Sequence, residues 1–340
     1  MQRLILLITT LTLAACSDPR QEVTTQLANQ VLFSAHGQWQ QSNSDLLGST
    51  RAWCDGVQEL ASLKKVFHRS QLAWSRLQPL MVGPLAEGNR SWQVQFWPDK
   101  RNMVARQTEA LLDEFADLDQ QQLEGASVVV QGLTAFEYVL FDDKVAIADN
   151  RERYCPLLVG IARHQQTLST EVLDLWQQPG GMLGQLTTFP NDRYANADEA
   201  LGGILRVQVT GVDTLKKKLG TPMGRLNNGV PQPYQAEAWR SRHSTENLLA
   251  SLDGAQAVWE RVRSLVGDAQ LVGDIDAAYK GVRDKLAALP APLMEMVQDK
   301  ANQPPLQSLY ADLDALENLQ QNDLARHLGI QIGFNANDGD

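Results

Sequence analysis

The chain has 340 residues, of which 43% are hydrophobic and 21% charged, and its formal net charge is −10. This composition is that of an ordinary globular protein and excludes an intrinsically disordered chain. Because the sequence is acidic and contains no basic block, we expect no binding to nucleic acid. The length allows two domains of ordinary size.

The first residues have the pattern of a bacterial lipoprotein leader. Arg3 opens a short positive region, and the apolar run over residues 4–13 is too short to span a bilayer. The run ends in the sequence LAAC, and small residues directly before a cysteine, here Cys16, resemble a lipobox. We therefore expect residues 1–16 to form a lipoprotein signal that ends in lipidated Cys16. The alternative is an ordinary secretory signal that happens to contain a cysteine.

The residue after Cys16 bears on which membrane holds the protein. Ser17 occupies the position where lipoproteins retained in the inner membrane usually carry Asp. Several acyl chains on one cysteine anchor a protein stably. We therefore expect an outer membrane lipoprotein that faces the periplasm, with the membrane as its first partner.

Two further cysteines, Cys54 and Cys155, remain beyond the leader. In an oxidising compartment, two cysteines indicate one disulfide bond. Free buried thiols and a cysteine nucleophile are the alternatives. A nucleophile would need a nearby histidine as base, and nothing in the sequence places one.

Apolar residues at helical spacing predict helices through the first half of the chain. The predicted helical regions are residues 21–47, 50–80, 102–118, 127–141 and 152–178. Residues 83–102 lack this periodicity and predict an ordered loop that carries Trp92, Phe96 and Trp97. Such a loop can hold a functional site or cap the end of a bundle, and both uses are open.

The second half has the same character after a predicted linker and domain boundary at residues 180–197. Helices are predicted over residues 197–219, 237–266, 269–289 and 306–328, and Gly220 behind three lysines marks the end of the first. No segment alternates as a strand would. The sequence predicts an all-α fold of two helical-bundle domains with about four helices each, over residues 20–190 and 195–340.

The predicted helix over residues 127–141 is apolar nearly all round, which is typical of a buried helix. Gln131, Thr134 and Glu137 nevertheless recur at intervals of three on one face. A buried carboxylate is costly unless it is paired, hydrogen-bonded or bound to metal. Glu137 therefore indicates either a structural salt bridge with an arginine or a ligand site.

Several kinds of catalytic site are excluded. The five histidines do not form HExxH, and the chain has no GxSxG, P-loop or CxxC motif. The sequence offers no catalytic residue, so a non-enzymatic protein is expected. Arg76, Arg90, Arg101 and Arg242 are candidate partners of Glu137, because an arginine pairs bidentately with a carboxylate.

Several motifs together resemble the imelysin family, also called iron-regulated protein A-like. They are the lipobox, AWSRLQPLMVGP, FWPDKRN, VVVQGLTAFEYVLF, SRHS and the tail GFNANDGD, which span nearly the whole mature chain. The resemblance implies two helical bundles derived by duplication, a periplasmic or membrane-anchored position and a part in bacterial iron uptake. Some relatives were labelled peptidases, an assignment that the motifs of this chain do not support. Because Arg76, Arg101 and Arg242 lie in segments that carry the resemblance, they are the predicted partners of Glu137.

The family signature GxHxxE reads here Gly132, Thr134 and Glu137, with Thr in place of His. A hydroxyl is a poor replacement for an imidazole ligand, although it can hold a metal-bound water or the glutamate. The resemblance implies Glu137 as the metal ligand and iron as the metal.

The hypothesis from the sequence is a protein that binds iron, an iron chelate or a component of an iron-uptake transporter between its two bundles. A metallopeptidase-like protein and an interaction lipoprotein with a decayed site are the alternatives. The predicted ligand-binding residues are Gly132, Thr134, Glu137, Arg76, Trp97, Asp99, Arg101, Ser241, Arg242 and Ser244.

Overall fold

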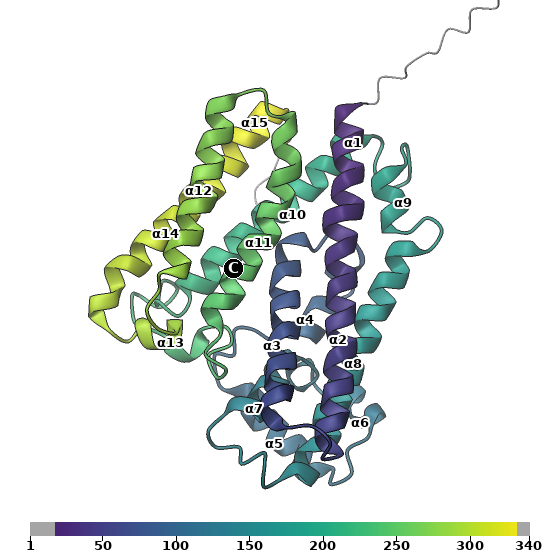
Figure 1. The fold of residues 1–340 in the computed structure, drawn as a ribbon, viewed down its shortest axis with the longest axis vertical. Coiled ribbons are helices and arrows are strands. Elements are labelled where there is room, and N and C mark those ends of the chain that lie inside the picture. Colours follow the sequence, from purple (N-terminus) through teal and green to yellow (C-terminus); the bar gives the residue numbers. More distant parts are fainter. Residues whose placement is uncertain (1–17, 332–340) are drawn as a thin grey trace, which may run out of the picture.

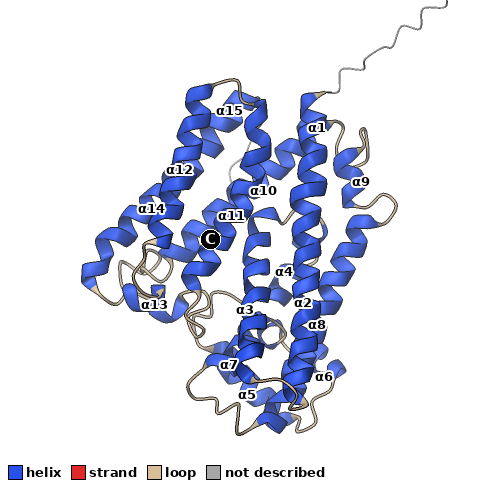
Figure 2. Cartoon of the chain, in the orientation of Figure 1, coloured by secondary structure: helices blue, strands red, loops and turns tan. Residues whose placement is uncertain are grey.

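The structure is a computed structural model, and it describes residues 18–331. Every regular element in that range is helical, which confirms the all-α prediction (Figure 2). The leader with Cys16 and the last nine residues of the tail lie outside the described residues. Within residues 18–331, no helix is both long and apolar enough to cross a membrane.

The first bundle is built on three long helical stretches that lie side by side (Figure 1). Its first stretch is continuous and consists of α1 (Pro19–Gln26), the segment Leu27–Phe33 and α2 (Ser34–Cys54). It packs against α3 (Leu60–Leu77) and α8 (Arg151–Gln177). The shorter helices are α4 (Arg90–Val94), α5 (Met103–Glu114), α6 (Gln120–Gly125), α7 (Leu133–Phe141) and α9 (Met182–Thr187).

The second bundle has four long helices, each packed against two of the others. They are α10 (Ala197–Gly220), α11 (Ser244–Val262), α12 (Ala269–Ala287) and α14 (Gln303–Asn318). The short helices α13 (Leu293–Met296) and α15 (Ala325–Leu328) complete it. A bundle of about four helices therefore fits this half, while the two-domain division and its origin by duplication stay predictions.

Several predicted boundaries differ from the structure. The loop expected over residues 83–102 contains the short helix α4, and the helix expected over residues 127–141 begins only at Leu133, so Gln131 lies before it. The helix expected over residues 50–80 is interrupted after Cys54, because Gly56 turns the chain with a φ of 75°. The linker expected over residues 180–197 contains the short helix α9. The helix expected from residue 237 begins only at Ser244, because Ala238 and Arg242 have φ values of 52° and 66°.

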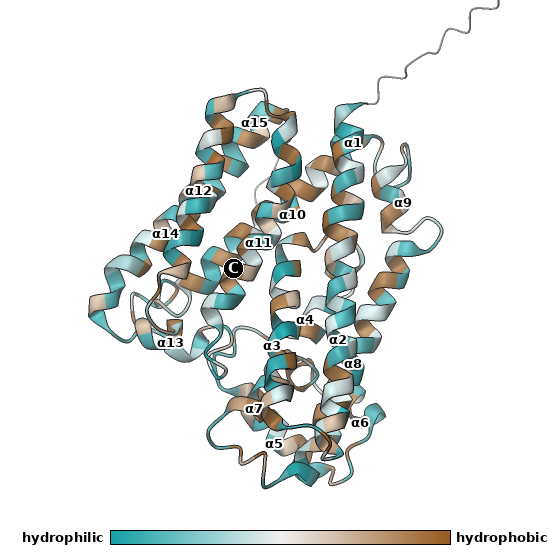
Figure 3. Cartoon of the chain, viewed as in Figure 1, coloured by the Kyte–Doolittle hydropathy of each residue, from teal (hydrophilic) through white to brown (hydrophobic). Residues whose placement is uncertain are grey.

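Glycines let the two bundles approach closely where α3 ends. A Cβ atom on Gly254 of α11 would lie 2.1 Å from the carbonyl oxygen of Arg76. A Cβ atom on Gly211 of α10 would lie 2.4 Å from the Cα atom of Pro79. Buried apolar side chains of both bundles belong to one continuous core, and apolar residues recur along the helices (Figure 3). The bundles are therefore in intimate contact along this interface.

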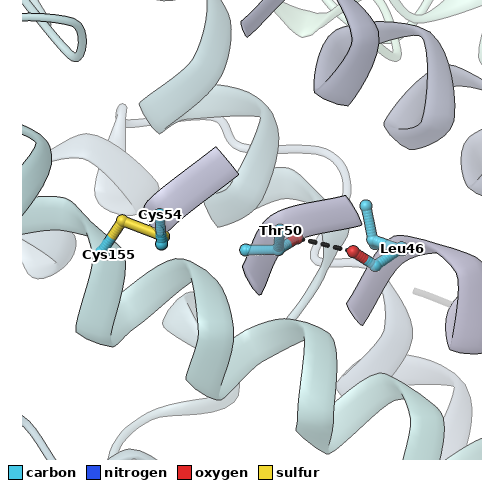
Figure 4. The surroundings of a disulfide bond; sticks show 4 residues. All are labelled: Leu46, Thr50, Cys54 and Cys155. Carbon is cyan, nitrogen blue, oxygen red and sulfur yellow. Dashed lines mark hydrogen bonds between the residues drawn. A yellow bond between two sulfur atoms is a disulfide. The ribbon is translucent and has the colours of Figure 1, made fainter. Parts of the chain in front are cut away.

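A disulfide bond joins Cys54, the last residue of α2, to Cys155 in the first turns of α8 (Figure 4). The two Cα atoms lie 5.8 Å apart, and 101 positions separate the cysteines in the sequence. The predicted pairing is confirmed. The bond connects two of the long helices of the first bundle at the end near α5 and α7.

Candidate functional site between the two bundles

Glu137 lies in the middle of α7, and only 2% of its surface is exposed. Its Oε1 atom accepts two hydrogen bonds from Ser241, one from the backbone N–H at 2.8 Å and one from the hydroxyl at 2.7 Å. Burial raises the pKa of Glu137, while the bonds from Ser241 and the positive charge of Arg240 act in the opposite direction. The carboxyl group therefore ties the first bundle to the segment that precedes α11.

The other residues of the motif also make contacts within the protein. The hydroxyl of Thr134 donates to the carbonyl oxygen of Phe96 at 3.1 Å. A Cβ atom on Gly132 would lie 2.6 Å from the carbonyl oxygen of Val94, so this position has room only for glycine. Gln131 donates to three carbonyl groups at the end of α6 and just after it. The motif thus fixes both the aromatic loop and the segment before α11.

The arginine near Glu137 is not one of the three expected partners. Arg76, Arg101 and Arg242 all have exposed side chains, and Arg242 pairs with Glu295 at the surface. The buried arginine is Arg240, which was not singled out from the sequence. The left-handed backbone at residues 238 and 242 presents the amide of Ser241, instead of a guanidinium, to the carboxyl group.

Arg240 connects the two bundles from the same segment. Its Nε atom donates to Asp142 at 2.9 Å, and its Nη2 atom donates to Asn102 at 2.7 Å. The guanidinium lies 4.3 Å from the ring centroid of Trp239 and 5.3 Å from that of Tyr138. Its charge is therefore satisfied, and it holds the ring of Trp239 by a cation–π contact.

A second buried pair, Lys218 with Glu237, was also missed from the sequence. Lys218 lies at the end of α10 and donates to the carboxylate of Glu237 and, at 2.6 Å, to Gln78. Burial lowers the pKa of Lys218, although Glu237 acts in the opposite direction. From the sequence, Lys218 belongs to the basic last turn of a predicted helix, together with Lys216 and Lys217. Its spacing of three from the buried Leu215 is the signal that distinguishes it.

The other predicted site residues have separate positions. Trp97 donates its ring N–H to the carbonyl oxygen of Gln235 at 3.0 Å. Asp99 accepts from the backbone amides of Met103 and Val104, at 2.6 and 3.1 Å, and so caps the start of α5. The hydroxyl of Ser244 donates to the carbonyl oxygen of Glu237. Of these three side chains, Trp97 bonds from the aromatic loop to the second half of the chain, whereas Asp99 acts within the first bundle and Ser244 joins the start of α11 to the segment before it.

A cleft of about 750 Å³ lies beside this contact. One wall comes from residues 99–102 with the first turn of α5 and from the end of α7 with the residues after it. The opposite wall comes from residues 232–242 and Met294. Of the predicted site residues, Asp99, Arg101 and Arg242 line this cleft. The segment that Glu137 holds through Ser241 supplies part of the second wall.

The side chains around Glu137 do not form a metal site of their own. Among residues 18–331, no group of three or more His, Cys, Asp and Glu side chains could hold a metal ion. Thr134 replaces the imidazole of the family signature, and its hydroxyl is used by Phe96. Iron coordinated by several protein ligands at Glu137 therefore does not fit these residues.

The model of the imelysin family matches residues 33–320. The chain belongs to the imelysin family. An imelysin-like protein from Psychrobacter arcticum 273-4 has the same fold, with a TM-score of 0.78, 20% identity and coverage of 93% of this chain and 97% of the other. A protein assigned as an iron-regulated protein A precursor, from Parabacteroides distasonis ATCC 8503, gives 0.73, 12%, 89% and 94% for the same measures. No curated protein matches the chain.

Proposed function

We propose that this imelysin-family protein is a binding lipoprotein of an iron-uptake system and that it takes up a ferric chelate in the cleft between its bundles. Its family and the iron-regulated protein with the same fold support a role connected with iron. The observation that carries the proposal is the cleft beside the motif helix. Its volume of about 750 Å³ is within the range of small-molecule sites.

A chelate suits the cleft better than a bare ion does. A chelated iron brings its own ligands, so the protein needs only to recognise the outside of the complex. Glu137 and Thr134 already form hydrogen bonds within the protein, to Ser241 and Phe96. The iron of a chelate needs neither side chain as a ligand. Glu137 is then a positioning residue that holds residues 236–243 in place, and it does not touch the ligand.

The proposed location follows from the leader. Lipid on Cys16 would anchor the protein to the outer membrane, close to the start of α1 at Pro19. Cys16→Ser should release the protein from the membrane fraction or block its processing. A soluble cytoplasmic protein that retains Met1 would contradict this location. From the periplasm, the loaded protein would deliver its ligand to a transporter component.

Binding of a ferric chelate can be tested with a substitution that fills the cleft. Ala105 lines the cleft in the first turn of α5, and Ala110 lies exposed on the same helix. Equilibrium dialysis of the mature protein with ferric citrate and with a ferric catecholate should show binding. Ala105→Trp should abolish that binding, and the control Ala110→Trp should retain it. Retention of neither chelate by the unaltered protein would favour the interaction lipoprotein with a decayed site.

Within residues 18–331, no observation favours a peptidase. We expect the purified protein not to cleave unfolded casein, with or without added divalent metal. Metal-dependent cleavage that disappears in Glu137→Gln would overturn this expectation, since Glu137 would then have to act on water or on the metal.

A further inference from the structure

The cleft carries charges and rings that narrow the class of chelate. Resting on the function proposed above, we propose that its ligand is an anionic, aromatic chelate of the ferric catecholate class. Two features support this assignment separately: the charges that the protein leaves without a partner, and the aromatic side chains on both walls.

Positive charges exceed negative ones in the cleft once internal pairs are removed. Asp99 is occupied by two backbone amides, and Asp142 is neutralised by Arg240. Lys100, Arg101 and Lys144 line the cleft with exposed side chains, and none has an ion pair within residues 18–331.

Against these three cations stand two acids on the described cleft wall, Asp143 and Asp99, because the amide hydrogen bonds of Asp99 do not cancel its charge. The chain as a whole is acidic, with a net charge of −10. A local excess of positive charge in an acidic protein concentrates anions at that place. The cleft is therefore electrostatically complementary to a ligand with a net negative charge.

Aromatic side chains from both halves of the chain line the same cleft. Phe141 and Tyr138 contribute from α7, and Tyr234 and Trp239 contribute from the second bundle. Tyr234 and Trp239 form an edge-to-face pair with ring centroids 5.0 Å apart, and the residue Tyr234 is 61% exposed. An exposed aromatic residue at the mouth of a cleft has an unused face on which a flat ring can stack.

Three kinds of ferric chelate differ in net charge and in aromatic content, the two properties that the cleft would recognise. A ferric complex of three catecholates is anionic, and each of its ligands carries a benzene ring. Ferric citrate is anionic but has no aromatic ring. Ferric acetohydroxamate is neutral and has no aromatic ring. The catecholate complex alone can use the cations and the aromatic walls together, so it should bind tightest.

Titration calorimetry of the mature protein with these three chelates tests the proposal. Gallium complexes of the same ligands serve as redox-inert duplicates. We expect the catecholate to bind at least about tenfold more tightly than citrate, which corresponds to one aromatic stacking contact. The hydroxamate should bind weakest of the three.

Substitutions separate the two recognition features. Arg101→Gln with Lys144→Gln should weaken catecholate binding by roughly tenfold at low salt and less at high salt, because the lost attraction is screened. The matched control Arg206→Gln, outside this cleft, should change nothing. Tyr234→Ala should weaken catecholate binding and leave citrate binding unchanged, whereas Trp92→Ala, which removes another exposed ring, should affect neither.

The outcomes distinguish this inference from the function on which it rests. Equal affinities for all three chelates, lost together in Ala105→Trp, would overturn the aromatic anion and keep the ferric chelate. Unchanged catecholate binding both in Arg101→Gln with Lys144→Gln and in Tyr234→Ala would also overturn it, because the ligand would then lie elsewhere. Absence of binding for every chelate would overturn the inference and the proposed function together.

Discussion

Glu137 and Ser241 are 104 positions apart in the sequence, and the Oε1 atom of Glu137 accepts both the amide and the hydroxyl of Ser241. Glu137 lies in the motif helix of the first bundle, and Ser241 lies just before α11 of the second. The signature glutamate therefore holds one wall of the cleft in position. The contact makes the motif a link between bundles in this protein.

Substitutions at Glu137 should show this anchoring role in stability. Glu137→Gln keeps an oxygen that can accept from Ser241, whereas Glu137→Ala leaves the buried amide and hydroxyl without an acceptor. We expect urea unfolding to show a loss of roughly 2–4 kcal/mol for Ala and much less for Gln. Glu114→Ala, at the exposed end of α5, is the control and should be nearly neutral. Equal losses in the Gln and Ala variants would contradict the anchoring role.

The same residue predicts a pH effect with a definite sign. Because burial raises the pKa of Glu137 above its usual 4.5, the folded protein holds this proton more tightly than the unfolded chain does. The resulting stability is fully present below the unfolded pKa and is lost as the pH rises through the folded pKa. Glu137→Gln lacks this loss. Its stability relative to the unaltered protein should therefore increase from pH 4 to pH 7, and a difference independent of pH would refute the raised pKa.

Glycines at the bundle interface give a third prediction. Gly254→Ala would bring a methyl group against the carbonyl oxygen of Arg76, and Gly211→Ala would bring one against Pro79. Each should destabilise the protein by about 1–3 kcal/mol or more, because neither neighbour is a flexible side chain. Gly273→Ala on α12 has open space and should stabilise by roughly 0.5–1 kcal/mol. Thermal unfolding of the three variants tests this prediction. A higher unfolding midpoint for Gly254→Ala would show that the bundles pack less closely than the structure indicates.

Because His36 is buried, we predict that the protein loses folding stability in acid. The side chain is fully buried, its Nδ1–H donates to the carbonyl oxygen of Leu32 at 2.8 Å, and burial lowers its pKa to about 4. The unfolded chain takes up this proton near pH 6.5 and the folded protein only near pH 4, so stability is lost as the pH falls through that window. The loss is roughly 3 kcal/mol. His36→Phe, which keeps a ring beside Trp176, should reduce this loss between pH 7 and pH 4 in urea titrations.

The disulfide gives a fifth prediction. Cys54 and Cys155 close a long loop, so the bond should stabilise the protein by roughly 4 kcal/mol in the chain-entropy model and by less in practice. Cys54→Ser with Cys155→Ser should lower the unfolding midpoint accordingly. Thiol titration of unreduced, denatured protein should find neither cysteine free. Two reactive thiols in that experiment would refute the bond.

Most of the helices could be predicted from the sequence because their buried faces repeat at helical spacing. Glu137 could be identified for the same reason, since a lone carboxylate in the apolar α7 is conspicuous. The cysteine pair followed from the number of cysteines and the expected compartment. These features are local, or they depend on counting, so one sequence is enough to find them.

The contacts between bundles could not be predicted in the same way. The turn over residues 237–243 needs positive φ at Ala238 and Arg242, and neither alanine nor arginine favours that backbone conformation. That turn determines that Ser241, instead of Arg242, reaches Glu137. The pairing of Lys218 with Glu237 depends on how α10 and that turn meet in space, which no local pattern specifies.

The most direct test of a ferric chelate in the cleft is an iron anomalous difference map. Crystals of the mature protein would be grown with a ferric catecholate, and data would be collected above the iron absorption edge. We expect one peak in the cleft, between Arg101 and Trp239, with Glu137 still bonded to Ser241. A map without a peak in the cleft, or with iron coordinated directly by Glu137, would contradict the proposed site.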